Sequence, residues 1–494
     1  MQDIHQQFDA IQIGLPDLWR RISHSREPRL AVAVPSLSLD LEGLPLPGGL
    51  LHFEERLLYL LHLLGQPACQ LWFLTSHLIS EEEVAYYLHF LRHVPYAHAR
   101  RRLRMQPMID RGLKPLTQKL LERPALLERL RNKIRGCPNA YLTVYSSTEL
   151  ELQLAVSLGL PILGTDPRHM GLAGKEQSRQ LFESLGLQVP PGRVGLRDLE
   201  DLTGAILELL DSGVIGAHCP YIVVKQNQGV SGLGNRRLSL MPFWNLLVAD
   251  LPREEKQARL AQALRRHWGD AEGKAFWPRF ERLGGVVEQH LEGESISVQV
   301  HISPLGEASI VGVLQEMMDE KGRYRGAIFP APDTLALPAL AQARKVADEL
   351  VNRGVCGRFE VDFLVQSEQV FALDLNFRKS NSTGSLRTLN LLAGGSYCPE
   401  SNLYRDAGGQ CRAMFTSDWL ALGPHARSPQ DIIELATEDG LNYSTATHSG
   451  IVFQMLGGAS ANGRVGVTSV GSSSDEAQAL YRQAEQLLGV GGLG

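Results

Sequence analysis

The apolar and polar positions of the first 165 residues follow two alternating patterns. Short apolar runs bounded by proline, glycine or polar residues predict buried strands at 29–37, 69–76, 140–147 and 160–163. Stretches with apolar residues at helical spacing predict amphipathic helices at 52–64, 80–94 and 147–159. Strands that alternate with helices along a chain favour a parallel sheet. We therefore expect a parallel α/β domain at the start of the chain.

From about residue 166 the pattern changes to helices followed by neighbouring strands. Helices are expected at 174–186, 197–212, 252–270 and 337–353. Strands are expected at 221–225, 284–291, 295–304, 309–327 and in a hairpin over 357–378. We expect 284–291 and 295–304 to be paired strands, so that this middle region is α+β with mostly antiparallel strands. The remainder, 400–494, returns to mixed helix and strand.

Composition narrows the class of protein without identifying it. The chain has 494 residues, 44% of them hydrophobic, which is typical of a globular protein with two to four domains. A net charge of −5 gives no support to a nucleic-acid partner. Six cysteines without CxxC spacing argue against a zinc site or a disulfide framework. With no signal-peptide pattern and no apolar run long enough to span a membrane, we expect a cytoplasmic protein without a membrane partner.

The hairpin over 357–378 carries acids on one face. In "VFALDLNFRKSN" (370–381), Asp374 and Asn376 alternate with apolar residues, and Asp362 has the same position in the strand before. A five-residue loop between the strands would place Asp362 opposite Asp374. Two carboxylates across a ladder repel, unless a cation lies between them. Carboxylates with an amide oxygen suit Mg²⁺. The alternative is a solvent-facing polar strand that Arg378 and Lys379 neutralise.

A lysine and a glycine-rich segment come earlier in the chain. In "VVKQNQGVSGLGN" (223–235), Lys225 ends an apolar strand and a loop rich in glycine follows. Glycines let backbone N–H groups approach an anion, and the lysine adds positive charge. Lys175 stands at the start of the helix expected at 174–186. An ordinary turn is the alternative, because this glycine-rich segment has neither the GxxxxGK[ST] nor the GxGxxG pattern.

The segment "VVEQHLEGES" (286–295) is an apolar strand that breaks into a polar linker. Such a linker can offer hydrogen-bonding groups to the edge of a purine, with Glu288 and Leu291 as the natural candidates. The alternative is a surface connection between two strands.

The order of these features resembles the ATP-grasp superfamily. "GKEQSRQLFESLGLQVPPG", "VVKQNQGVSGLGN", "DLNFRKS", "PLTQKLLERP" and "SGIVFQMLG" look like segments of the PGM1-type peptide ligases within it. The resemblance implies a pre-ATP-grasp parallel α/β domain over 1–165 and an ATP-grasp domain over 166–395. Its two lobes would span about 166–285 and 286–395. An α+β segment, 396–494, would pack on the ATP-grasp domain.

The resemblance also implies roles for individual residues. ATP phosphates would be held by Lys175, Lys225, Gly229, Ser231, Gly232, Gly234 and Asn235. The adenine would meet Glu288 and Leu291, and the ribose Glu294. Mg²⁺ would be bound by Asp362, Asp374 and Asn376. Catalysis would involve Lys225, Arg378, which would stabilise developing charge, and Arg325, for which binding of the substrate carboxylate competes with a role in a solvated turn.

Two departures from the family pattern concern the cleft. The family usually has glutamate where this chain has Asp374, and a glycine- and threonine-rich run where this chain has "SNSTGS" (380–385). The first bears on metal geometry and the second on the substrate.

The implied function is an ATP-dependent carboxylate–amine (peptide) ligase that works through an acylphosphate. Its substrates would be a small-molecule or peptide carboxylate donor and an amine acceptor, and a homodimer is the default assembly. A kinase- or carboxylase-like ATP-grasp enzyme and a catalytically silent nucleotide-binding protein are the alternatives.

Overall fold

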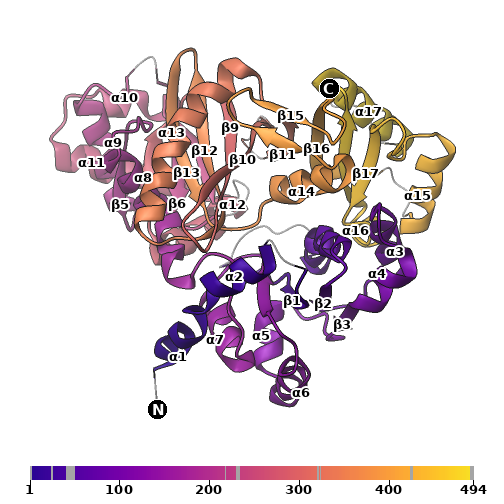
Figure 1. Cartoon of the computed structure of the whole chain (residues 1–494). Coiled ribbons are helices and arrows are strands. Elements are labelled where there is room, and N and C mark those ends of the chain that lie inside the picture. The colour runs from indigo at the N-terminus through magenta and orange to yellow at the C-terminus, as the bar shows by residue number, and fades with distance from the viewer. Residues whose placement is uncertain are drawn as a thin grey trace.

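Three β-sheets form the frame of the molecule in a computed structural model (Figure 1). The structure describes residues 3–23, 26–39, 50–216, 219–229, 234–319, 322, 324–422 and 427–489. Parallel and antiparallel sheets and helices are all present, which confirms the mixed α/β and α+β class. The boundaries expected at 165, 285 and 395 stay predictions.

The first sheet is parallel, with the strand order β3-β2-β1-β4. Its strands are β1 (Arg29–Val34), β2 (Cys69–Thr75), β3 (Leu103–Pro107) and β4 (Ala140–Val144). The helices around it are α1 (Ile4–Gln12), α2 (Leu15–Ser23), η1 (Leu50–Gly65), α3 (Glu81–His89), α4 (Tyr96–Arg102), α5 (Leu116–Leu121), α6 (Pro124–Ile134) and α7 (Glu149–Leu158). All six residues of β1 are buried, because helices cover both faces of a parallel sheet.

Local signals account for the helix boundaries here. The Ser80 hydroxyl accepts a hydrogen bond from the Glu83 N–H at the start of α3, and Thr148 and Glu151 form a capping box at the start of α7. The expected strand at 160–163 is reduced to a single bridge between Leu142 and Ile162. Edge strand β3 was not predicted, because only some of its side chains are buried.

The second sheet is antiparallel, with the order β5-β8-β6-β7. Its strands are β5 (Gly192–Leu196), β6 (Tyr221–Gln226), β7 (Asn235–Ser239) and β8 (Gly285–Gln289). The helices of this region are α8 (Lys175–Ser184), α9 (Leu199–Asp211), α10 (Trp244–Leu247), α11 (Arg253–His267) and α12 (Ala271–Leu283), with the short turns η2 (Pro167–Ala173) and η3 (Met241–Phe243). Apolar residues of α9, α11 and α12 pack on this sheet in one core.

The third sheet has ten strands among the described residues and continues into the C-terminal part of the chain. Its strands are β9 (Glu294–Ile302), β10 (Ala308–Met318), β11 (Tyr324–Phe329), β12 (Gly357–Gln366), β13 (Gln369–Asn376), β14 (Ser396–Cys398), β15 (Leu403–Arg405), β16 (Cys411–Ala421), β17 (Gly450–Gln454) and β18 (Arg464–Gly471). The main path runs β13-β12-β9-β10-β11-β16-β15-β14, and β18 joins β16 to β17. The accompanying helices are α13 (Asp333–Asn352), α14 (Asn381–Ala393), α15 (Pro429–Glu438), α16 (Gly458–Asn462) and α17 (Ser474–Leu487).

The expected pairing of 284–291 with 295–304 is wrong. β8 pairs with β5 and β6, whereas β9 pairs with β10 and β12, so each strand already has two neighbours in a different sheet. Residues 290–293 therefore cross from one sheet to the other. Gly293 lies tightly against the hairpin in this crossing, because a Cβ on it would be 2.6 Å from the Val365 carbonyl oxygen.

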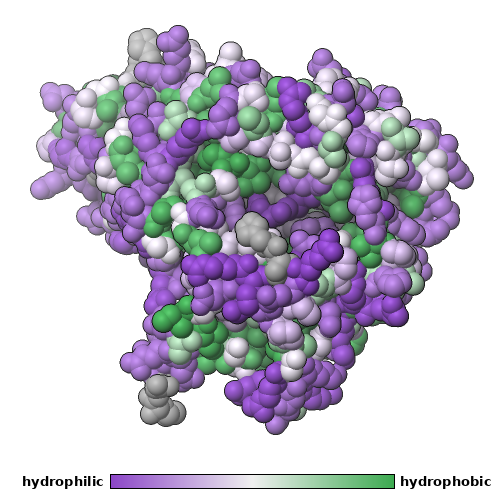
Figure 2. All heavy atoms as spheres, in the orientation of Figure 1, coloured by the Kyte–Doolittle hydropathy of each residue, from purple (hydrophilic) through white to green (hydrophobic). Residues whose placement is uncertain are grey.

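None of the described helices is both long and apolar enough to span a bilayer. Hydrophilic side chains cover most of the face shown in Figure 2, and hydrophobic ones are scattered among them.

The first and third sheets share one apolar core at the C-terminal end of the chain. The buried Tyr86 hydroxyl of α3 accepts a hydrogen bond of 3.0 Å from the Phe453 N–H of β17. Behind β17, the Gly457 N–H donates to the buried Glu55 carboxylate at 3.0 Å. The N-terminal part therefore contacts the C-terminal strands directly.

We expect Tyr86→Phe to lower the free energy of unfolding by about 1–3 kcal/mol, because it leaves the buried Phe453 N–H without its acceptor. Urea unfolding followed by tryptophan fluorescence measures the loss. Tyr96→Phe is the matched control, since Tyr96 is 40% exposed. Equal stability of the Tyr86→Phe variant and the wild type would contradict this reading of the contact.

Candidate functional site

A cavity of about 680 Å³ lies between the second and third sheets. It is lined by β6, β8, the crossing segment 290–293, the end of β10 and the β12–β13 hairpin. Most of the residues expected in the site line it: Lys175, Lys225, Gly229, Gly234, Asn235, Glu288, Leu291, Glu294, Asp362, Asp374, Asn376 and Arg378. Ser231 and Gly232 lie outside the described residues. The fold therefore brings together residues that are 203 positions apart in sequence, from 175 to 378.

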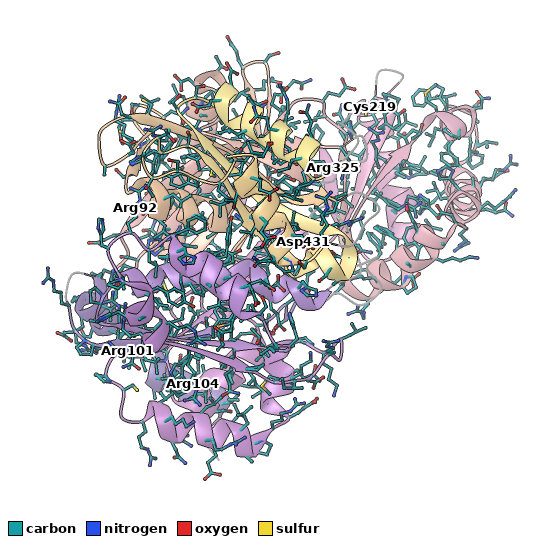
Figure 3. The ribbon with its side chains drawn as sticks, turned by 90° about the vertical axis from the view of Figure 1, so that its right-hand side faces the viewer. Arg92, Arg101, Arg104, Cys219, Arg325 and Asp431 are labelled. Atoms are coloured by element: carbon teal, nitrogen blue, oxygen red, sulfur yellow. The ribbon has the colours of Figure 1, made fainter. Side chains whose placement is uncertain are left out.

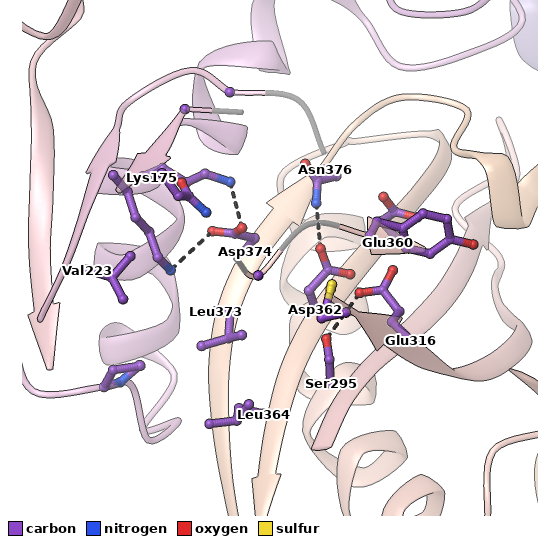
Figure 4. Close-up of a pocket in the computed structure, with 18 of the residues that line it drawn as sticks. Lys175, Val223, Ser295, Glu316, Glu360, Asp362, Leu364, Leu373, Asp374 and Asn376 are labelled. Carbon is purple, nitrogen blue, oxygen red and sulfur yellow. Dashed lines mark hydrogen bonds and ion pairs between the residues drawn. The ribbon is translucent and has the colours of Figure 1, made fainter. Parts of the chain in front are cut away.

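Two lysines meet one carboxylate at the centre of this cavity. The Lys175 Nζ lies 2.7 Å from Asp374 Oδ2, and the Lys225 Nζ lies 3.9 Å from Asp374 Oδ1 (Figure 4). Burial opposes the charge of Lys225, but Glu288 and Asp374 outweigh it and raise the pKa of Lys225 to about 12. Burial would raise the pKa of Asp374, yet the two lysines hold it below its usual range. Lys225 and Asp374 are therefore both charged at neutral pH.

The backbone around the lysines fixes their positions. The Lys175 N–H donates to the Asn227 carbonyl, and the Asn227 side chain accepts from the Glu176 N–H, which ties the start of α8 to the loop after β6. Gly229 and Gly234 close that loop in direct contact, since a Cβ on Gly234 would lie 3.1 Å from the Gly229 Cα. This close approach explains the glycines on both sides of the loop.

Glu288 holds Lys225 in place. Its buried carboxylate lies 2.7 Å from Lys225 Nζ through Oε2 and 2.9 Å from Arg179 Nη1 through Oε1. Both oxygens are occupied, so this side chain positions the lysine, a role that the sequence did not suggest. Glu288, Lys225 and Arg179 are therefore buried charges that each have a partner of opposite sign, as low dielectric surroundings favour.

The hairpin places its acids opposite each other, though not through the expected loop. Asp362 pairs with Asp374, and the turn is closed at Gln366 and Gln369 by two residues rather than five. A β-bulge at Asp362/Phe363 adds the residue that restores the register. The expected juxtaposition is present because the bulge adds one residue on β13, Leu373, to the two-residue turn and so restores the odd spacing that it needs.

Two further acids lie beside this pair. Glu316, on β10, and Glu360, on β12, line the same cavity as Asp362. Burial, together with the charge of Glu360, raises the pKa of Glu316 to about 7. Burial also raises the pKa of Asp362 well above its usual value, and the charges of Glu316, Glu360 and Asp374 add to this rise. These four carboxyl groups form one side of the cavity, here called the acidic wall, which holds two more acids than the sequence analysis predicted.

The alternating pattern contained a signal for Glu360 but not for Glu316. Glu360 stands two positions before Asp362 and hence on the same strand face. Glu316 enters the cluster only because β10 pairs with β9, where it lies opposite Ser295 and accepts a hydrogen bond of 3.1 Å from that hydroxyl. Its place depends on a strand register that no local pattern reveals.

Neighbouring side chains donate hydrogen bonds or form ion pairs with some of the carboxylate oxygens of this acidic wall. Arg378 Nη1 lies 2.8 Å from Glu360 Oε1, and Gln299 donates to Glu360 Oε2 at 2.6 Å. Asn376 donates to Asp362 Oδ2 at 2.8 Å (Figure 4). The buried Oδ1 atoms of Asp362 and Asp374 accept no hydrogen bond within the described structure. Carboxylate oxygens without hydrogen-bond donors are the type of ligand atom that hard cations prefer.

Arg325 is the one described residue of the expected set that does not line the cavity. Successive side chains of a strand point to opposite faces. Tyr324 lines the cavity, whereas the Arg325 Nε lies 3.8 Å from Asp319 Oδ2 and its side chain is 42% exposed (Figure 3). The suggested role of Arg325 in substrate binding finds no support in this geometry.

The polar segment 380–385 is the start of helix α14. Ser380 and Thr383 form its capping box, and Ser380 and Ser382 line the cavity. The departure from the family pattern therefore stands beside the acidic wall, at a helix start.

Two family models match the chain: an ATP-grasp domain over residues 268–382 and the PGM1 C-terminal domain over residues 431–484. The first match includes Glu288, the acidic wall and Arg378, but begins after Lys175 and Lys225.

A relative that spans nearly the whole chain is the L-propargylglycine–L-glutamate ligase of Streptantibioticus cattleyicolor. It is 26% identical over 451 residues, which are 88% of this chain and 89% of the relative.

Solved structures share the fold at low sequence identity. An ADP complex of N5-carboxyaminoimidazole ribonucleotide synthetase has a TM-score of 0.52 at 14% identity, covering 93% of this chain and 96% of that one. The biotin carboxylase domain dimer of Hydrogenobacter thermophilus 2-oxoglutarate carboxylase, with MgADP and bicarbonate, has a TM-score of 0.54 at 13% identity, covering 93% and 90%.

The family models and the motif order agree on both parts of the chain, and the solved structures agree with them on the fold. Residues 268–382 therefore match an ATP-grasp domain and residues 431–484 match a PGM1 C-terminal domain, as the order of the motifs predicts.

Proposed function

We propose that this protein is an ATP-dependent carboxylate–amine ligase that joins amino acids or short peptides through an acylphosphate. The observation that carries the proposal is the pair of lysines, Lys175 and Lys225, that meets Asp374 beside an acidic wall with unsatisfied oxygens. Cations that face acids across one cavity suit a polyphosphate with its metal. The relative from S. cattleyicolor is named as a ligase of two amino acids, which supports substrates of that class.

ATP would lie along the cavity from the crossing segment to the acidic wall. Lys175 and Lys225 would exchange Asp374 for phosphate oxygens, and Gly229, Gly234 and Asn235, which line the cavity, would lie beside the phosphates. Leu291 and the Glu288 backbone would meet the adenine. Glu294, whose carboxylate accepts a 2.8 Å hydrogen bond from Gln315, would be available to the ribose.

The acidic wall fits Mg²⁺. Asp362, Asp374 and Asn376 would hold it, and the Oδ1 atoms of both aspartates, which accept no hydrogen bond within the described structure, would be the ligand atoms. Asp374 is one methylene shorter than the usual glutamate, and its place opposite Asp362 brings the two carboxyl groups onto one face. When bound, the ion would neutralise phosphate charge.

The proposed reaction has two steps, and residues of this chain would hold the reacting groups in place. An oxygen of the donor carboxylate attacks the γ-phosphorus of ATP, the bond to the β-phosphate oxygen breaks, and ADP leaves. The acceptor nitrogen then attacks the acyl carbon, loses a proton, and inorganic phosphate leaves with its bonding electrons. Arg378, held by Glu360 at the edge of the wall, would face the charge that develops on the transferred group.

Amine dependence separates this function from the alternatives. We expect purified protein with ATP and Mg²⁺ to form an amide, with ADP and phosphate in equal amounts, from a matching pair in a panel of amino acids and dipeptides. Mass spectrometry of the product and a coupled ADP assay measure both. Full ADP release without any amine would favour a kinase- or carboxylase-like reaction. ATP binding with no turnover across the panel would favour a silent nucleotide-binding protein.

The lysine–aspartate cluster gives a second prediction. We expect Lys225→Met and Asp374→Asn each to lower turnover about 10²–10³-fold, because each removes a charge aimed at the phosphates or their metal. Circular dichroism checks that the variants fold. Lys345→Met, a substitution of an exposed lysine on α13, is the matched control and should keep full activity. Wild-type turnover in either cluster variant would show that the site is assigned wrongly.

Metal dependence gives a third prediction. We expect Asp362→Asn to raise the Mg²⁺ concentration needed for half-maximal ADP formation at least about 10-fold, since an amide supplies a weaker ligand than a carboxylate. A Mg²⁺ titration at saturating ATP measures the shift, with Asp348→Asn on the exposed face of α13 as control. An unchanged titration would exclude Asp362 as a metal ligand.

A further inference from the structure

The polar face of the third sheet continues beyond the acidic wall. On β9 and β12, the pairs Ser297–Asp362, Gln299–Glu360 and His301–Arg358 follow one another at every second residue. Each step along such a face is roughly 7 Å, so Arg358 lies two steps, about 13 Å, from Asp362. The side chains therefore change from acidic to basic along a single surface.

A second cavity of about 610 Å³ covers this basic end. One wall is formed by β9, β12 and α14, and the other by η1 and β4 of the N-terminal part. Arg378 and Tyr145 line both this cavity and the first one. The two cavities therefore meet at the arginine that would face the transferred phosphoryl group.

Basic side chains dominate the second cavity. Arg358, Lys379 and Arg387 line it, and Lys379 donates to the Val144 carbonyl. Within the described ranges, neither Arg358 nor Arg387 has an acidic side chain within ion-pair distance. Glu307 is the one acid among the described lining residues, and it is exposed. Among the residues that the structure describes, Arg358 and Arg387 are thus cations without an acidic partner.

The electrostatics agree with this geometry. Burial, with repulsion from Arg387, lowers the pKa of Arg358 to about 9. Burial, with repulsion from both arginines, lowers the pKa of Lys379 to about 7. The buried Tyr59 hydroxyl, which also lines the cavity, has no hydrogen-bond partner in the described structure. An anion would relieve the repulsion between the cations and would accept a hydrogen bond from the Tyr59 hydroxyl.

We infer that Arg358 and Arg387 bind a second substrate carboxylate, distinct from the one that is phosphorylated, and so select amino-acid substrates. The inference rests on the proposed function. Guanidinium groups bind carboxylates through two parallel hydrogen bonds, and a cavity of this volume is in the usual range for small ligands. The carboxylate belongs either to a dicarboxylic acyl donor or to the amino acid that supplies the amine.

Kinetics of Arg358→Gln, Arg387→Gln and the double variant test the inference. We expect the KM of one amino-acid substrate to rise about 10- to 100-fold in each single variant, with the KM of ATP unchanged, because a charge-assisted hydrogen bond is lost. Arg358→Lys and Arg387→Lys should recover part of the affinity. A rise for the donor identifies a dicarboxylic donor, and a rise for the acceptor identifies the acceptor's own carboxylate.

Thermal unfolding separates binding from folding. We expect the glutamine variants to melt at or above the wild-type temperature, because they remove buried charges that lack partners. Arg353→Gln changes an exposed arginine that pairs with Glu349 at 2.8 Å one turn earlier, and is the matched control. Its KM values should equal those of the wild type.

Direct binding makes the outcome independent of turnover. Calorimetry with L-glutamate, L-glutamine, glutarate and each remaining amino acid is done on the wild type and the double variant. Binding that the double variant loses supports the cavity even if no amide forms, in which case the ligase proposal alone fails. Amide formation with unchanged KM values in the double variant overturns the cavity and leaves the ligase. Failure of every carboxylate to bind the wild type also overturns the inference.

Discussion

The contact of Lys175 and Lys225 with Asp374 joins the two sheets that enclose the site. The lysines come from α8 and β6, on the side of the second sheet, while Asp374 comes from β13 of the third. All three groups are largely buried, where an unpaired charge is costly. Each side of the cavity therefore stabilises the charge of the other. A polyphosphate bound there would have to replace Asp374 as the partner of the two lysines. The Asp374 carboxylate thus occupies the position that a phosphate oxygen would take.

Acidic and basic groups are separated along the sheet face rather than mixed. Glu316, Glu360 and Asp362 crowd at one end, and Arg358 stands at the other, with Arg378 between them and paired to Glu360. If each acid stood beside a base, burying these charges would cost less free energy. The separation leaves unsatisfied oxygens at one end and unpartnered guanidinium groups at the other, which is the arrangement expected of surfaces that wait for ligands of opposite charge.

Sequence patterns predicted many of the helices and strands, though not edge strand β3, and some of the residues that end strands. The α/β start, the antiparallel middle and the positions of Lys175 and Lys225 could be read locally, because helix caps, strand periodicity and glycine loops are local signals. The register of strands that are distant in the sequence could not be predicted from local patterns. The contribution of Glu316, the crossing at 290–293 and the bulge after Asp362 each depend on which strands pair, which is set by packing of the whole sheet. Arg358 could be placed in part. Its position two residues before Glu360 puts it on the same polar strand face, but that this end of the face lines a cavity follows only from the structure.

The continuous third sheet has a consequence for how such proteins can change. Strand β11, inside the region matched as an ATP-grasp domain, pairs directly with β16, so the backbone ladder runs into the C-terminal part without a break. Loss of the C-terminal part would leave β11 as an exposed edge strand, whose unpaired backbone groups promote association with other chains. The C-terminal part therefore cannot be deleted or exchanged as freely as an appended domain. The region matched as an ATP-grasp domain and the C-terminal part are thus expected to be inherited together, and chimaeras between relatives should be joined in loops that leave the β11–β16 ladder within one parent.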